Sequence, residues 1–148
     1  MNQISEIKIS YKDRTSISKS KKINSSINTS ELLFNTWDQE TIELLESFKV
    51  VLLNNSNRVK GICEISTGGI TGTLVDIRII MALALKSLST TIIIAHNHPS
   101  GTLKPSSADR RLTKKIKLAC ELFDIKLLDH IILAPNGKHF SFADSNLI

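Results

Sequence analysis

The segment TTIIIAHNH, residues 90–98, constrains the fold of this chain more than any other stretch. Its β-branched run predicts a strand buried on both faces of a sheet, which requires a covering layer on either side. A long helix is predicted after it, at residues 106–123, from apolar residues that recur at helical spacing. A buried strand followed by such a helix is typical of a layered α/β protein.

Further strands are expected from apolar or alternating runs on both sides of this segment. They lie at residues 49–54, 59–66, 125–135 and 138–143. The first two are expected to pair as a hairpin across the turn NSNR. Strands that alternate with helices predict a mixed sheet in an α/β fold.

A second long helix is expected at residues 76–89, with Asp76 as its N-cap. The predicted apolar faces consist of Ile80, Leu83, Ala84 and Leu88 in this helix and of Leu112, Ile116, Ala119, Cys120 and Phe123 in the helix at 106–123. Helical turns are predicted at 31–37 and 38–48, capped by Thr29 or Ser30 and by Asp38.

Residues 1–29 differ in composition from the rest of the chain. They are rich in Ser, Lys, Asn and Thr and poor in large apolar side chains, so they can bury little. We predict a polar, loosely ordered arm with a short edge strand at residues 7–11. Residues 30–148 are expected to form one domain that needs neither disulfides nor a structural metal to bury a core.

The composition, 41% hydrophobic and 22% charged, is ordinary for a soluble protein. Neither a signal peptide nor a membrane span is predicted, because the N-terminus lacks an apolar region and the apolar stretches are short or interrupted. Cys63 and Cys120 form no CxxC pair and are expected to be buried, reduced thiols of a cytoplasmic protein. The net charge of +5 fits a solvated surface, with attraction to a polyanion as the alternative.

Two histidines end the predicted strand at residues 90–98. His96 and His98 alternate with Asn97, so both imidazoles are expected on one side of the strand. By itself an HxH pair is a weak indication of a metal site. The loop that follows contains two prolines and a glycine and must turn, which can bring Asp109 back over the histidines.

A competing explanation exists for Asp109. Ser106 and Asp109 are spaced like a helix capping box, and one carboxylate is not expected to serve fully as cap and as ligand. Spacing alone favours neither role. Three N/O ligands with an open position are typical of a catalytic zinc site, which also needs a general base. Residue type offers His130 and Glu46 for that base, and spacing leaves the choice open.

The string HNHPSGTLKPSSAD, residues 96–109, resembles the JAMM (JAB/MPN+) metalloprotease motif. In that motif HxH is followed after seven intervening residues by Ser, and Asp follows after two more intervening residues. Together with LLDHIIL and SFAD, it resembles the RadC branch of the family from residue 30 to the C-terminus. The resemblance implies a cytidine deaminase-like, three-layer fold with a curved mixed sheet flanked by helices.

The resemblance also implies roles for individual residues. His96, His98 and Asp109 would ligate Zn²⁺, Glu46 would be the general base, and Ser106 would hydrogen-bond the developing oxyanion. The implied activity is zinc-dependent hydrolysis of peptide or isopeptide bonds, with a peptide or protein as substrate.

Two departures from the RadC pattern matter. VDIR at residues 75–78 stands where relatives usually have V-x-P-R, which affects a helix start and not the metal. Longer relatives carry an N-terminal helix-hairpin-helix region, whereas this chain has the short polar arm. We therefore expect a JAB-domain-only form, which weakens any DNA-repair role taken from the family name.

Two further groups have both a structural and a functional interpretation. A basic helix face begins beside Asp109 and is either a solvated face or a dock for an anionic partner such as nucleic acid. It consists of Arg110, Arg111, Lys114, Lys115 and Lys117. Asp129 and His130 are expected to be a satisfied structural pair or to support a ligand from behind, with a metal ligand or catalytic acid as the alternative. The alternatives to a peptidase are a metal-dependent nuclease and a non-enzymatic, DNA-associated binding module.

Overall fold

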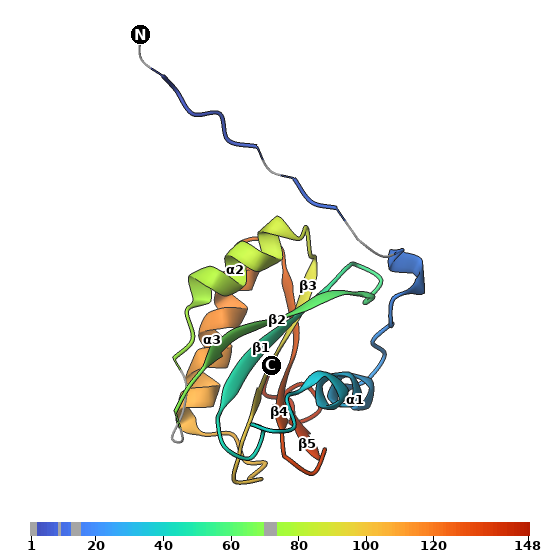
Figure 1. The fold of residues 1–148 in the computed structure, drawn as a ribbon, viewed down its shortest axis with the longest axis vertical. Helices are drawn as coiled ribbons and strands as arrows, with labels where there is room; N and C mark the ends of the chain where they lie inside the picture. The colour runs from blue at the N-terminus through green and yellow to red at the C-terminus, as the bar shows by residue number, and fades with distance from the viewer. Residues whose placement is uncertain (1–2, 9, 13–15, 70–73) are drawn as a thin grey trace.

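A five-stranded sheet forms the middle layer of the computed structural model, which describes residues 3–8, 10–12, 16–69 and 74–148 (Figure 1). The strands lie in the order β2-β1-β3-β4-β5. Their bounds are Ser47–Leu53 for β1, Val59–Thr67 for β2, Thr91–Asn97 for β3, Lys126–Leu133 for β4 and His139–Ser141 for β5. Only the pairing of β3 with β4 is parallel, so the predicted mixed sheet and the hairpin of β1 and β2 are confirmed.

Helices cover both faces of this sheet (Figure 1). Two of them, α2 (Ile77–Lys86) and α3 (Ser107–Glu121), lie on one face, and α1 (Ser26–Thr36) lies on the other. A short 3₁₀ helix, η1 (Ile17–Lys19), precedes α1. Helix α3 connects the parallel strands β3 and β4, as a crossover must. The expected three-layer α/β architecture is confirmed.

Alternation along the strands divides the core into two clusters. The cluster under α2 and α3 includes Phe48, Val50, Leu52, Ile80, Ala84, Ile92, Ile94, Ile116 and Cys120. The cluster under α1 includes Leu33, Trp37, Val51, Leu53, Ile93, Ala95, Ile131 and Leu133. All of β3 is buried, as its β-branched run predicts. Continuing its alternation puts His96 on the α2 and α3 face and Asn97 on the α1 face.

The predicted start of the first helix is wrong. Helix α1 begins at Ser26, and its N-cap is Ser25, whose side chain accepts the Asn28 N–H at 3.2 Å. Thr29 or Ser30 was expected as the cap, but both lie buried inside the helix. Ile23, which precedes this helix, is only 3% exposed and belongs to the buried core. The domain boundary at residue 30 stays a prediction.

The helical turns expected over residues 38–48 are formed only in part, because Ser47 and Phe48 already belong to β1. Residues 38–45 form successive turns, in which the Ile42 N–H donates to the Asp38 carbonyl at 3.0 Å. The Asp38 side chain accepts the Glu40 N–H at 2.9 Å, so Asp38 does cap the first turn. The chain then enters β1 at Ser47, because the apolar side chains that follow are buried in the sheet.

Both long helices end earlier than predicted. Helix α2, capped by Asp76 as expected, stops at Lys86, and Leu88 takes a left-handed φ of 52° in the turn into β3. Helix α3 stops at Glu121. Leu88 and Phe123 are therefore 65% and 51% exposed and do not belong to the buried helix faces.

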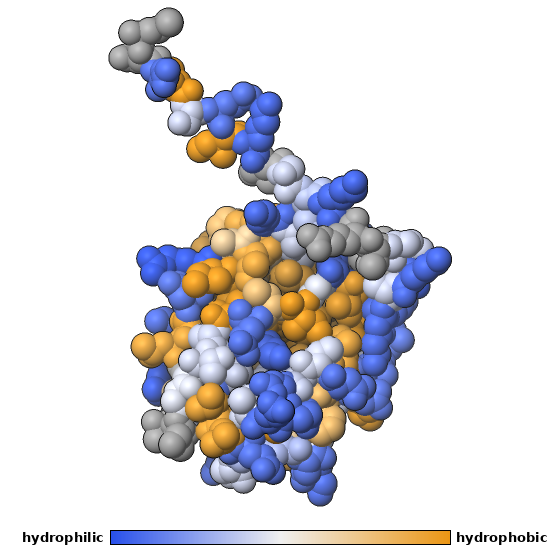
Figure 2. Space-filling view, in the orientation of Figure 1, coloured by the Kyte–Doolittle hydropathy of each residue, from blue (hydrophilic) through white to orange (hydrophobic). Residues whose placement is uncertain are grey.

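The N-terminal segment differs from the packed body. Residues 3–8 are exposed and stretch away from it (Figures 1 and 2). The edge strand predicted at 7–11 is not formed by its described residues, and Ile9 lies outside the described part.

Cys120 is a buried free thiol, as predicted, whereas Cys63 is free but only half-buried. Among the described residues, no helix combines the length and apolar character needed to cross a membrane.

Candidate metal centre

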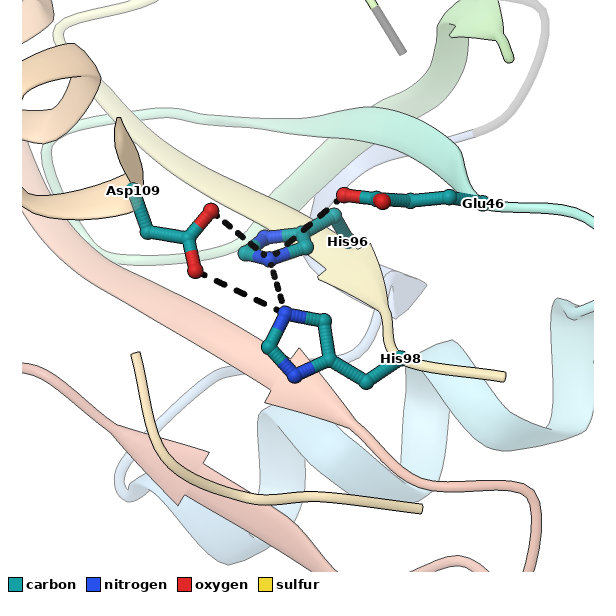
Figure 3. Close-up of side chains that lie close together, drawn as sticks. All are labelled: Glu46, His96, His98 and Asp109. Carbon is teal, nitrogen blue, oxygen red and sulfur yellow. Dashed lines mark hydrogen bonds and ion pairs between the residues drawn. The ribbon is translucent and has the colours of Figure 1, made fainter. Parts of the chain in front are cut away.

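Three separate segments bring four polar side chains together at the end of β3 (Figure 3). His96 and His98 lie at the end of β3 and just beyond it, and Asp109 lies in the first turn of α3. Glu46 directly precedes β1, whose Phe48 is paired with His96 in the sheet. One potential donor atom from each residue lies within 4.8 Å of all the others.

The separations between these donor atoms suit a single metal ion. His96 Nε2 is 3.0 Å from His98 Nε2 and 3.3 Å from Asp109 Oδ1. His98 Nε2 is 3.5 Å from Asp109 Oδ2. Ligands around a tetrahedral zinc at about 2.0–2.1 Å lie about 3.3 Å apart, so these three residues fit such an ion. Glu46 Oε1, 3.8 Å from His96 Nε2, stands at the edge of the group, where a base would be needed.

Asp109 takes part in a helix cap and also faces both histidines. Its Oδ2 accepts the Ser106 N–H at 2.7 Å, and Ser106 Oγ accepts the Asp109 N–H at 3.0 Å, which completes a capping box. The same carboxylate still faces both histidines, because each oxygen can accept more than one hydrogen bond. The capping box therefore does not turn the carboxylate away from the histidines, and it holds the carboxylate in place.

The surroundings of Asp109 favour its charged form. Burial opposes ionisation, but the neighbouring rings of His96 and His98 and the hydrogen bond from the Ser106 N–H outweigh it and hold the pKa of Asp109 well below its usual range. Ser106 itself is exposed. Its hydroxyl oxygen accepts one hydrogen bond and its proton is available for another partner.

The orientation of His98 is set by the loop that follows it. His98 Nδ1 donates to the Thr102 carbonyl oxygen at 2.6 Å, so the unprotonated Nε2 of the neutral ring faces the other donors. Gly101, with a φ of 81°, provides the left-handed turn that brings this carbonyl back. The hydrogen bond with Asp109 raises the pKa of His98 in spite of partial burial. Thr102 was not recognised from the sequence.

His130 lies behind His96 and not at the open side of the centre. Its Nε2 is 2.8 Å from His96 Nδ1, and its Nδ1 is 2.6 Å from Thr113 Oγ1. Burial lowers the pKa of His130 well below its usual value, so the ring is neutral. His130 is thus not placed as a general base for a ligand on the open side, and Glu46 is the better placed of the two candidates. Thr113 was not singled out from the sequence.

Asp129 has a different, structural contact set. Its Oδ1 accepts the backbone N–H groups of His130 and Ala143 at 2.7 and 3.0 Å, and its Oδ2 accepts the Ser141 hydroxyl at 2.6 Å. These bonds tie β4 to β5 and the C-terminal turn. Asp129 and His130 are both satisfied, but they are not hydrogen-bonded to each other through their side chains.

The basic face of α3 lies next to the centre. Four of its residues are exposed and Lys117 is half-buried, and within the described parts of the chain none of the five forms a salt bridge. In the departure VDIR, Asp76 accepts the Arg78 N–H at 3.0 Å as the N-cap of α2, and none of these four residues is part of the group at the centre.

Comparison with known proteins agrees with this geometry. The family described as RadC-like JAB domain matches residues 23–147. The UPF0758 protein of Flavobacterium johnsoniae is 49% identical over 102 residues, which cover 69% of this chain and 44% of that protein. The UPF0758 protein of Haemophilus ducreyi is 42% identical over 119 residues, 80% of this chain and 53% of that protein. The chain thus spans about half the length of the curated relatives it matches.

Proposed function

This chain belongs to the RadC-like JAB domain family, and we propose that it is a zinc-dependent hydrolase that cleaves amide or isopeptide bonds in peptides or proteins. The observation that carries the proposal is the convergence of Glu46, His96, His98 and Asp109 within 4.8 Å. The Nδ1–H of His98 is bound to a backbone carbonyl, as is usual for metal-ligating histidines.

Each residue has a chemical role in this proposal. His96, His98 and Asp109 would hold the ion, and the chemistry that zinc would supply when bound is the acidification of water towards a pKa of about 7 and the polarisation of a carbonyl group. Glu46 accepts a proton from the attacking water as the new C–O bond forms. Glu46 then delivers that proton to the leaving nitrogen as the C–N bond breaks. The Ser106 hydroxyl donates a hydrogen bond to the carbonyl oxygen as negative charge develops on it.

Glu46→Gln tests the proposal against Glu43→Gln, an exposed neighbour, as the matched control. Both variants and the unaltered chain are loaded with zinc and offered a set of peptides and isopeptide-linked substrates, with and without chelator. We expect chelation to abolish cleavage and Glu46→Gln to keep the metal but lose about 10²–10⁴-fold in rate. Full activity of Glu46→Gln would contradict the assignment of the base.

A second candidate is hydrolysis of phosphodiester bonds. It is favoured by the basic face of Arg110, Arg111, Lys114, Lys115 and Lys117, which begins one residue after Asp109. Offering DNA and RNA to the same zinc-loaded chain distinguishes the two reactions. Binding without cleavage that weakens steeply with salt would favour a non-enzymatic, DNA-associated module instead.

The proposal places the chain in the cytoplasm. The free thiols of Cys63 and Cys120 are consistent with a reducing compartment.

A further inference from the structure

A chain of buried hydrogen bonds runs behind the candidate metal centre, from one proposed ligand to another. His96 Nδ1 is 2.8 Å from His130 Nε2, and His130 Nδ1 is 2.6 Å from Thr113 Oγ1. Thr113 Oγ1 donates in turn to the backbone carbonyl of Asp109 at 2.7 Å. The exposed fractions of His96, Thr113 and His130 are 1%, 3% and 0%, so water does not compete for these bonds.

The direction of each bond follows from its neighbours. The Asp109 carbonyl can only accept, so the single proton of the Thr113 hydroxyl points towards it. Thr113 Oγ1 must then accept from His130, which puts the proton of the neutral His130 ring on Nδ1. His130 Nε2 is left as an acceptor, so the partner atom His96 Nδ1 must carry a hydrogen.

This direction is the one that metal binding requires. With its hydrogen on Nδ1, the neutral His96 ring has a free lone pair on Nε2, the atom that faces His98 and Asp109. The opposite tautomer would place a hydrogen on Nε2 and remove that lone pair. To form it while keeping the chain, Thr113 would have to give up its bond to the Asp109 carbonyl, because a hydroxyl has only one proton.

We propose that His130 and Thr113 are positioning residues that fix the tautomer of His96 and tie its ring to the helix turn that carries Asp109. Two aromatic rings keep His130 in place for this task. Phe142 stacks on it with ring centroids 4.5 Å apart, and Phe48 approaches it edge-on at 5.9 Å. The inference rests on the metal site of the proposed function but does not depend on which bond that site hydrolyses.

Zinc affinity of the full chain tests the inference, measured by competition with a chromogenic chelator. Thr113→Val keeps the shape of the side chain and removes the hydroxyl, whereas Thr113→Ser keeps the hydroxyl as the matched control. We expect Thr113→Val to weaken zinc binding about 10–100-fold and Thr113→Ser to change it less than about threefold. Equal affinity in the wild type and Thr113→Val would overturn the inference.

Nitrogen-15 NMR of the wild-type chain loaded with Zn²⁺ gives a second test that needs no variant to fold. We expect His130 to be neutral with its proton on Nδ1, and His96 to carry its proton on Nδ1. A proton on His130 Nε2 would overturn the inference while leaving hydrolysis possible. A wild-type chain that binds no zinc would overturn both this inference and the proposed function. Zinc binding with no cleavage of any substrate would overturn the proposed function alone.

Discussion

The side-chain amide of Asn97 fastens the segment before β1 to β3, accepting the Ser47 N–H through Oδ1 at 2.7 Å. Its Nδ2 donates to the carbonyl oxygens of Ile42 and Leu45 at 2.8 and 2.9 Å. Asn97 is fully buried, at 0% exposed. One residue, placed between the two histidines, therefore holds the turn that leads into Glu46.

Asn97→Ala should destabilise the fold by about 2–4 kcal/mol, because a buried N–H and two carbonyls lose their partner. Urea unfolding measures this change in the free energy of unfolding. Asn55→Ala, at an exposed position in the β1–β2 turn, is the control and should have little effect. Equal stability of the two variants would show that Asn97 does not hold this segment.

Some features of this site are set by residues that are close in sequence, and these could be predicted; others are set by contacts between distant segments. Strand alternation predicted that His96 and His98 point to the same side, whereas the grouping of Asp109 with them followed from the family resemblance, because spacing alone left its role open. The capping box was visible in the spacing of Ser106 and Asp109, but not that one carboxylate could also face the histidines. That outcome depends on the path of the whole loop.

Features that depend on contacts between elements were missed. Thr113 is a mid-helix threonine with no distinctive local pattern, and its contact with His130 exists only because α3 packs against β4. Leu88 continues the helical spacing of α2, but the chain must reverse there to reach β3, and this requirement outweighs the local pattern. Periodicity therefore predicted the layers better than it predicted where each helix ends.

Asp129→Ala should destabilise the protein by about 2–4 kcal/mol, because the buried His130 N–H and the partly buried Ala143 N–H lose their acceptor. Asp129→Asn should cost less, because its carbonyl oxygen can still accept both. Burial raises the pKa of Asp129 despite these bonds, so the neutral amide also avoids burying a charge. Thermal unfolding of the two variants checks the order, and a larger loss for Asp129→Asn would contradict the role of these two bonds.

His98 should titrate above its ordinary pKa of 6.5 in the metal-free protein, because Asp109 accepts a hydrogen bond from its protonated ring. Its protonated form therefore stabilises the metal-free fold below about pH 6.5, and this contribution is lost as pH rises through the raised pKa. NMR titration of the His98 ring with chelator present measures that pKa.

Asp109→Asn should bring the pKa of His98 down, because burial then acts without the opposing carboxylate. Glu121→Gln, at the exposed far end of α3, should leave it unchanged and serves as control. A wild-type pKa at or below the ordinary value, or no response to Asp109→Asn, would show that the carboxylate does not act on His98 in this way.

The two thiols should differ sharply in reactivity towards a disulfide reagent. Burial raises the pKa of Cys120 to about 11, so near pH 8 only about one molecule in a thousand carries the reactive thiolate, and the side chain is also fully buried. Cys63 is half-buried on β2, which is an edge strand of the sheet. We expect one thiol to react in the native chain and both to react after unfolding in guanidinium. Cys63→Ser should abolish the reaction of the native chain. If this variant still reacted, Cys120 would have to become exposed by separation of α3 from the sheet.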